Sequence, residues 1–302
     1  YLEALDWYLA PTDSNDVNPD PDKAPDVINN SWYCSEEEGC NIDNWNLMQV
    51  SVANLKAAGI VVVASAGNSG PGCETIAFVP GMLEEAFVVG ATNQVDTIAG
   101  FSSRGAVSAD SSMRMKPDIS APGVGVYSSV LNHGYSYFSG TSMAGPHVAG
   151  LVALMVGANP KLAGQVDTIQ EIIKRTADPK TFSQDCSGLS GLDIPNPIYG
   201  YGRINSLRAV QEALKYQTSR TDKVSTSNFQ LFPNPAASSI MLKRNNSHSG
   251  IIEIFDLHGK KVISIQSQLE FTHIDLTSLN AGVYFVKLNQ GNKIEIGKFI
   301  KV

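Results

Sequence analysis

A run of β-branched residues from Ile60 to Ala64 limits the folds that this chain can adopt. A continuous apolar run of this kind is typical of a strand buried on both faces of a parallel sheet. Ala86 to Ala91 repeats the pattern, and a helix capped by Asp43 or Asn44 precedes the first run and ends at Gly59. Strands that alternate with helices predict an α/β fold, in which functional loops gather at the carboxyl ends of the parallel strands.

The segment from Gly140 to Gly150 passes from glycine into a helix of small residues. Ser142 falls in the first turn, where free backbone N–H groups and the positive end of the helix dipole favour negative charge on its oxygen. An ordinary helix cap is the simpler interpretation of a hydroxyl residue here. The position also suits a nucleophile.

A second polar residue follows the Ile60–Ala64 strand, in the loop Ser65 to Pro71. The amide N–H2 of Asn68 can donate to a developing negative charge, although an Asn after Gly is most often a turn residue. Acyl transfer needs a nucleophile and donors for the oxyanion. Ser142 and Asn68 together would supply both.

Three segments of the chain resemble subtilisin-like serine peptidases, the subtilase or S8 family: Gly140 to Pro146, Ala66-Gly67-Asn68 and Asn30-Ser31-Trp32. The resemblance covers residues 26 to 215 and implies a subtilisin-like parallel sheet with helices on both faces. It implies that Ser142 is the attacking serine and Asn68 the oxyanion donor of an endopeptidase. The walls of the substrate cleft are implied to be Ser31, Trp32, Ser65, Ala66 and Gly67. Tyr33 stands where relatives usually have Gly, so the rim of the cleft is expected to be partly filled.

The base and the acid of the triad have no match in the sequence. Subtilases place Asp and His before the Ser, yet neither an Asp-x-Gly nor a His-Gly-Thr motif occurs here; His133 comes too late in the chain, and His147 lies in the nucleophile helix. We therefore expect a carboxyl portion of a peptidase whose acid, base and first sheet strands precede Tyr1, and which is inactive as it stands. The alternative is a surface-displayed, non-catalytic binding protein on a subtilase scaffold.

The charge balance changes sign along the chain. Residues 1–218 carry 12 Lys and Arg against 23 Asp and Glu, whereas residues 219–302 carry 10 against 6. This change predicts two separately built domains, 1–217 and 228–302, joined by a polar linker at 218–227. An acidic larger domain excludes nucleic acid as an expected partner, and no apolar run is long enough to predict a transmembrane helix.

Short β-rich runs after residue 250 predict the hairpins of a small all-β sandwich. Several motifs in residues 228–302, among them Leu231 to Ala236 and Leu279 to Lys287, resemble the type A C-terminal sorting domain of the Por (type IX) secretion system. The resemblance implies export across a Gram-negative outer membrane, to the medium or the cell surface, with the outer-membrane secretion machinery as a partner. A generic ligand-binding sandwich is the alternative. His248, His258 and His273 fall in this part of the chain and are expected to be exposed.

The four cysteines indicate disulfides in an exported protein, but their spacing leaves all three pairings of Cys34, Cys40, Cys73 and Cys186 open. Zinc binding is the alternative interpretation of the cysteines, but the sequence contains neither a Cys-x-x-Cys motif nor a His pair to support it. Asp16, Asn18 and Asp20 begin a calcium-loop pattern, but Pro21 and Val27 occupy its Gly and Glu positions. We expect no cofactor; structural calcium is common in the family, but its ligands cannot be matched to this sequence.

Overall fold

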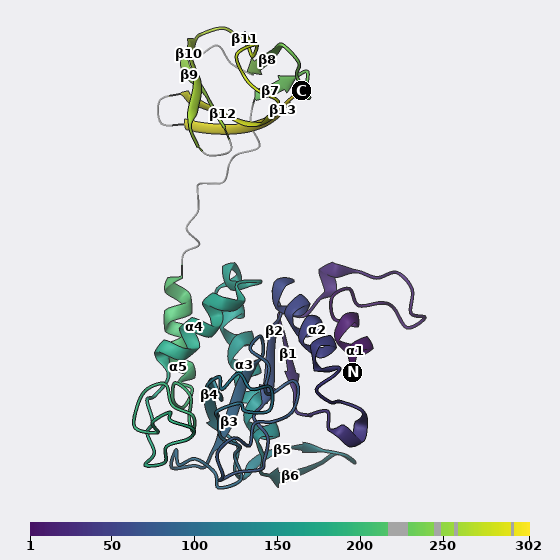
Figure 1. Cartoon of the computed structure of the whole chain (residues 1–302), viewed down its shortest axis with the longest axis vertical. Coiled ribbons are helices and arrows are strands. Elements are labelled where there is room, and N and C mark those ends of the chain that lie inside the picture. The colour runs from purple at the N-terminus through teal and green to yellow at the C-terminus, as the bar shows by residue number, and fades with distance from the viewer. Residues whose placement is uncertain (217–228, 245–248, 257–258, 291–292) are drawn as a thin grey trace. The chain divides into compact units, whose positions relative to one another are not determined.

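The protein is represented by a computed structural model that describes residues 1–216, 229–244, 249–256, 259–290 and 293–302 (Figure 1). The chain divides into two compact units, Tyr1–Gln217 and Thr218–Val302, with separate hydrophobic cores. The expected linker at 218–227 lies outside the described residues, as do His248 and His258.

A four-stranded parallel sheet forms the centre of the first unit. Its strands follow the chain order: β1 (Val27–Asn30), β2 (Val61–Ser65), β3 (Phe87–Thr92) and β4 (Ile119–Pro122). The strands expected at Ile60–Ala64 and Ala86–Ala91 are thereby confirmed, each displaced by one residue.

Successive side chains of β2 pack into two different hydrophobic cores, one on each face of the sheet. Val61 and Val63 pack into the cluster on one face of the sheet, and Val62 and Ala64 pack into the cluster on the other. All four are at most 1% exposed. Because both faces are covered, the strand must be apolar throughout, and this requirement explains the unbroken β-branched run.

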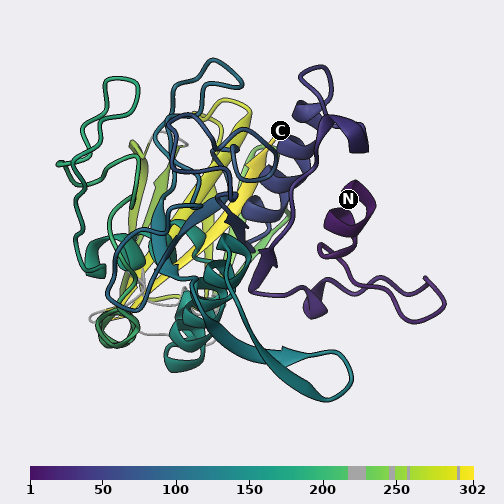
Figure 2. The same cartoon turned by 90° about the horizontal axis from the view of Figure 1, so that it is seen from below.

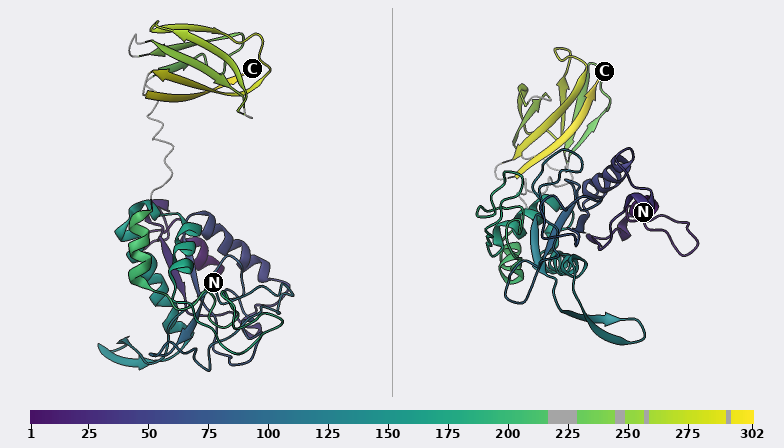
Figure 3. Two further views of the ribbon diagram at one scale, coloured as in Figure 1. Left: turned by 90° about the vertical axis from the view of Figure 1, so that its left-hand side faces the viewer. Right: turned by 60° about the horizontal axis from the view of Figure 1, so that its bottom comes forward.

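Helices cover both faces of the sheet (Figures 2 and 3). On one face α3 (Thr141–Ala158) contacts all four strands, with α5 (Ser206–Lys215) against α3 and α4 (Val166–Thr176) against α5. On the other face lies α2 (Trp45–Ala57), which contacts α1 (Leu2–Trp7). Short 3-10 helices occur at η1 (Pro21–Lys23), η2 (Glu36–Glu38) and η3 (Pro160–Leu162).

The helix α3 is long and apolar enough to cross a membrane, with a mean hydropathy of 1.3 over 18 residues. Its apolar side chains have another explanation in this fold, because Val148, Leu151, Val152 and Met155 are at most 1% exposed and belong to the sheet-facing core. The composition of α3 therefore follows from its central place against the sheet.

A two-stranded hairpin precedes α3 and projects from the body of the first unit (Figures 2 and 3). It consists of β5 (Val126–Val130) and β6 (Gly134–Phe138), which pair antiparallel. The strand expected at Tyr135 to Ser139 is thus one arm of this hairpin. Its exposed rings contact one another, with Tyr127 against both Tyr135 and Tyr137.

The second unit is a sandwich of two antiparallel sheets, as expected. One sheet has the order β10-β9-β12-β13 and the other β11-β8-β7. The strands are β7 (Phe229–Phe232), β8 (Ser239–Arg244), β9 (Gly250–Phe255), β10 (Lys261–Ser267), β11 (Phe271–Asp275), β12 (Gly282–Gln290) and β13 (Lys293–Lys301). Three of them, β7, β8 and β11, were not expected from the sequence. In β8 and β11 polar residues occupy buried positions, Arg244 and Thr272, and they interrupt the apolar alternation that marks a strand.

Two disulfides connect the four cysteines, and both lie in the first unit. Cys34 pairs with Cys40, six residues away, and Cys73 pairs with Cys186, 113 residues away. The structure therefore selects one of the three pairings that the spacing leaves open.

Two leucines of α3 test the assignment of the core. Leu151 is 1% exposed and Leu154 is 59% exposed. We expect Leu151→Ala to lower the free energy of unfolding by about 2–5 kcal/mol through lost burial and a cavity. Leu154→Ala should change it by less than about 0.5 kcal/mol. Denaturant titration monitored by tryptophan fluorescence reports on the first unit alone, because Trp7, Trp32 and Trp45 are the only tryptophans. Equal losses for the two variants would contradict this assignment.

Candidate active site

Three elements of the first unit meet at one pocket of about 470 Å³. The residues after β1 form one wall, Ser31 to Tyr33, and the residues from the end of β2 form the facing wall, Ser65 to Ser69. The first turn of α3 contributes Thr141 and Ser142. The pocket therefore lies at the carboxyl ends of two parallel strands and at a helix amino terminus, where functional groups of α/β sheets gather.

The side chain of Asn68 is fixed by the start of α3. Its Oδ1 accepts hydrogen bonds from the backbone N–H of Thr141 at 2.9 Å and from the Thr141 hydroxyl at 3.0 Å. The same hydroxyl accepts from the N–H of Gly67 at 3.2 Å. Because both contacts to Thr141 use the oxygen of the amide, the Asn68 N–H2 group remains available as a donor.

Ser142 is held in the first turn of α3 by contacts with Ser31. The Ser31 hydroxyl donates to the Ser142 carbonyl at 2.9 Å, and the Ser142 hydroxyl donates to the Ser31 carbonyl at 3.4 Å. The Asn29 side chain donates to the Ser31 hydroxyl at 2.8 Å. This chain of bonds links the end of β1 to Ser142 in the first turn of α3.

The loop that carries Asn68 is supported from behind by the segment 101–103. The N–H of Ser103 donates to the Gly67 carbonyl at 3.0 Å, and the Ser103 hydroxyl accepts from the N–H of Ser69 at 3.0 Å. Gly67 has a φ of +100°, and a Cβ there would lie 2.9 Å from the Ser103 hydroxyl. Glycine is therefore required both by the backbone conformation and by the close approach of Ser103.

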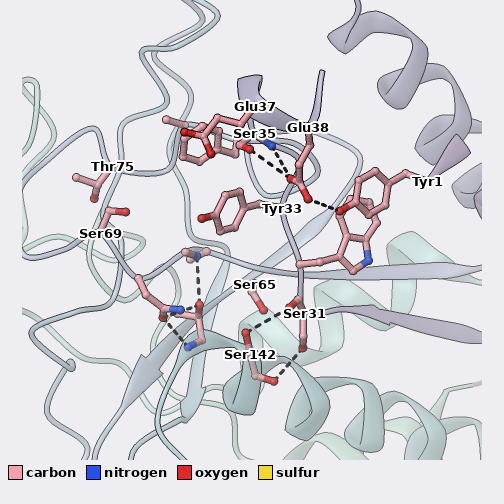
Figure 4. A pocket seen from close by; sticks show the side chains of 17 residues that line it. Tyr1, Ser31, Tyr33, Ser35, Glu37, Glu38, Ser65, Ser69, Thr75 and Ser142 are labelled. Carbon is pink, nitrogen blue, oxygen red and sulfur yellow. Dashed lines mark hydrogen bonds between the residues drawn. The ribbon is translucent and has the colours of Figure 1, made fainter. Parts of the chain in front are cut away.

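All seven residues that the sequence predicts for the site line this single pocket: Ser31, Trp32, Ser65, Ala66, Gly67, Asn68 and Ser142. Figure 4 shows Ser31 and Ser142 facing each other, with Ser65 beside them and Tyr33 above in that view. The structure brings the predicted residues together. Their catalytic and substrate-binding roles stay predictions.

The pocket also contains residues that the sequence analysis did not assign to it. They are Tyr1, Ser35, Glu37, Glu38, Ser69, Thr75, Ala77, Phe78 and Thr141. The position next to Ser142 could have identified Thr141. Ser35, Glu37 and Glu38 lie in the loop that the Cys34–Cys40 disulfide closes, and spacing alone does not predict that this loop reaches the pocket.

No histidine lines the pocket among the described residues. His147 lies in α3 with its Nδ1 at 2.9 Å from the Met143 carbonyl, one turn back along the same helix. His133 belongs to the turn of the projecting hairpin, and His273 to β11 of the second unit. In the described part of the chain, no three His, Cys, Asp or Glu side chains converge as a metal site.

Comparison with known proteins gives a family match for each of the two units. Residues 3–202 match the Subtilase family, and residues 230–302 match the Secretion system C-terminal sorting domain. The chain is 40% identical over 213 residues to bacillopeptidase F of Bacillus subtilis, and the match covers 69% of this chain and 14% of that protein. It is 33% identical over 236 residues to the serine protease AprX of the same organism, covering 69% of this chain and 47% of that one.

A solved structure from Pseudoalteromonas arctica, described as a protease, has a similar fold. It superposes with a TM-score of 0.51 at 25% sequence identity, covering 70% of this chain and 57% of that chain. The chain thus spans less than half the length of the two curated relatives.

The Thr141 hydroxyl offers a test of how the pocket is held together. Thr141 is fully buried. We expect Thr141→Val to leave the Gly67 N–H without its acceptor, at a cost of about 1–3 kcal/mol. Exchange of the Gly67 amide hydrogen, followed by NMR, should then become roughly 10- to 100-fold faster. Thr141→Ser keeps the hydroxyl and should keep the protection. Loss of protection in both variants would show that the hydroxyl is not the contact that matters.

Proposed function

Because the chain belongs to the subtilase family, we propose that it is the nucleophile-bearing part of a secreted serine endopeptidase. The observation that carries the proposal is the arrangement of Ser142 and Asn68 around one pocket, with Asn68 fixed through its amide oxygen. The reaction class is acyl transfer, which needs no cofactor.

In the proposed reaction the Ser142 hydroxyl oxygen attacks the carbonyl carbon of a peptide bond, and its proton passes to the triad base, which we place outside this sequence. The carbonyl oxygen then carries negative charge, and the Asn68 N–H2 group and the backbone N–H of Ser142 donate to it. The positive end of the α3 dipole lies at the same point and stabilises the same charge. Collapse of this intermediate breaks the C–N bond, the base gives its proton to the leaving amine, and the acyl-enzyme that remains is hydrolysed by water.

We propose that the base and the acid of the triad come from residues outside this sequence. Two observations support this. The Ser142 hydroxyl bonds to a backbone carbonyl rather than to an imidazole, and no histidine lines the pocket in the described part of the chain. In addition, the outer edge of β1 carries no paired strand among the described residues. Loss of a triad base lowers turnover by about 10⁶-fold, so we propose that the 302 residues alone are nearly inactive.

The other candidate is a non-catalytic binding protein on the same scaffold. The walls of the pocket would serve such a protein equally well, because an extended peptide can be held as an added strand. A binding protein has no chemical need for an oxyanion donor. The double hydrogen bond that orients Asn68 therefore favours the peptidase.

The sorting domain at residues 230–302 indicates export to the cell surface or the medium. We propose that these residues are recognised by the outer-membrane secretion machinery, and that the substrates are extracellular proteins or peptides. Two disulfides in the first unit agree with an oxidising location.

Covalent labelling tests the peptidase directly. In a protein that includes the sequence encoded upstream of Tyr1, we expect a fluorophosphonate to label Ser142 and Ser142→Ala to abolish the labelling. Asn68→Ala should lower peptide turnover about 10²–10³-fold, the loss known for one oxyanion donor in a subtilisin.

Ser69→Ala is the matched control for the labelling experiment. Ser69 lines the same pocket and its N–H is bonded to Ser103, but its hydroxyl has no place in the proposed reaction. We expect labelling and turnover to be unchanged in this variant. An unlabelled Ser142 in a protein that still binds peptides would favour the binding scaffold.

Fusion to a reporter tests the sorting domain. Residues 217–302 attached to a reporter should direct it to the surface or the medium of a Gram-negative cell with this secretion system. Removal of residues 293–302 deletes β13, which pairs with β12 along its whole length, and should retain the reporter inside the cell. Immunoblotting of cell fractions gives the distribution. Equal export of the reporter with and without residues 293–302 would disprove this role.

A further inference from the structure

A short loop closed by a disulfide stands beside the pocket. Residues 34–40, called the disulfide loop below, follow directly on the wall Ser31–Tyr33 and are closed by Cys34–Cys40. Within the loop η2 carries three successive glutamates, and a capping box links Ser35 with Glu38. The loop is therefore a compact acidic element attached to one wall of the pocket.

The disulfide loop is joined to the segment that forms another side of the pocket. The N–H of Cys34 donates to the Val79 carbonyl at 3.0 Å, and Cys34 is only 1% exposed. Tyr33 and Phe78, the residues just before these two, have stacked rings with centroids 4.9 Å apart and an interplanar angle of 25°. Both rings line the pocket and remain 54% and 37% exposed. The pocket thus contains aromatic surface that is not used in the core.

Glu37 and Glu38 are the only charged side chains that line the pocket in the described part of the chain. The carboxylate of Glu38 accepts from the N–H of Ser35 at 3.0 Å and from the Tyr1 hydroxyl at 3.1 Å. The Ser35 bond first, and the Tyr1 bond after it, hold the pKa of Glu38 below its ordinary value. Glu37 makes no hydrogen bond or ion pair within the described residues. Its charge is therefore available to a bound molecule.

We propose that the disulfide loop makes this pocket selective for peptides with a Lys or Arg side chain, seated between the Tyr33–Phe78 pair and Glu37. The inference rests on the proposed function, because it takes the pocket to be the place where a peptide binds. An ammonium or guanidinium group is attracted both by aromatic faces and by carboxylates. A neutral side chain of similar length gains only the aromatic contact, and an acidic one is repelled.

Calorimetric titration of the 302-residue chain tests the selectivity without requiring catalysis. The probes are blocked hexapeptides that are identical except for one central residue, Lys, Gln or Glu. At low ionic strength we expect the Lys peptide to bind about fivefold more tightly than the Gln peptide, the range of a solvent-exposed charge pair. The Glu peptide should bind most weakly. Added salt should reduce the difference, because exposed charges are screened.

Two neighbouring glutamates give a matched pair of variants. Glu37→Gln should bring the affinity for the Lys peptide close to that for the Gln peptide. Glu36→Gln removes the same charge one residue away, from an exposed side chain that does not line the pocket, and should leave most of the preference. Both positions are exposed, so neither change should disturb folding; unchanged tryptophan fluorescence verifies this.

The outcomes separate this inference from the proposed peptidase. Equal affinity for the Lys and Gln peptides, or equal effects of the two variants, overturns the selectivity and leaves the peptidase standing. Charge-selective binding by the 302-residue chain, together with an unlabelled Ser142 in the protein that includes the upstream sequence, upholds the selectivity and overturns the peptidase. Absence of binding by all three peptides overturns the inference, and labelling of Ser142 then decides the peptidase separately.

Discussion

The contact between Asn68 and Thr141 is the interaction on which the site depends. Asn68 belongs to the loop after β2, and Thr141 is the first residue of α3, so this contact joins a sheet end to a helix start. Both residues use groups that would otherwise lack partners, since the first N–H groups of a helix have no acceptor within it. The two hydrogen bonds thus cap the amino terminus of α3 and orient the Asn68 side-chain amide. The amide therefore lies at the positive end of the α3 dipole.

Glycine allows α3 to approach the sheet closely enough for that contact. A Cβ on Gly123, the residue after β4, would lie 2.6 Å from the Cβ of Ala91 and 2.8 Å from the carbonyl of Gly140, so there is no room for a side chain where this residue meets the start of α3. A Cβ on Gly145 would lie 2.5 Å from Oδ1 of Asn29 in β1. Within the run from Gly140 to Gly150, packing therefore requires glycine at Gly145, whereas a Cβ on Gly150 would meet no atom within 4 Å.

The strands β2 and β3 could be predicted because both are buried on both faces, so that each is an unbroken apolar run in the sequence. The meeting of Asn68 and Ser142 at one pocket could be predicted because both residues lie in short local motifs. The rest of the pocket could not, since Glu38 and Phe78 reach it through loops fixed by long-range contacts such as that of Cys34 with Val79. In the sandwich, β8 was missed because a buried Arg244 occupies an inward position, with its guanidinium bonded to the Leu269 carbonyl. Periodicity detects apolar burial, and it fails where a charge is buried with a partner.

The site separates into two halves that a fold can supply independently. In the proposed peptidase, the half that binds the acyl group needs a pocket, a nucleophile and fixed donors, and all of these would come from β1, β2 and α3, which share the cores of one sheet. The half that moves protons needs a base within reach of the Ser142 hydroxyl, and that hydroxyl now bonds to the Ser31 carbonyl. Oxyanion donors and binding alone retain about 10³–10⁴-fold catalysis over water in a serine peptidase without its triad. The acyl-binding half therefore has a chemical value of its own. The buried Thr141 hydroxyl helps to fix the Asn68 amide before any substrate binds. Peptide binding alone does not explain that fixed orientation.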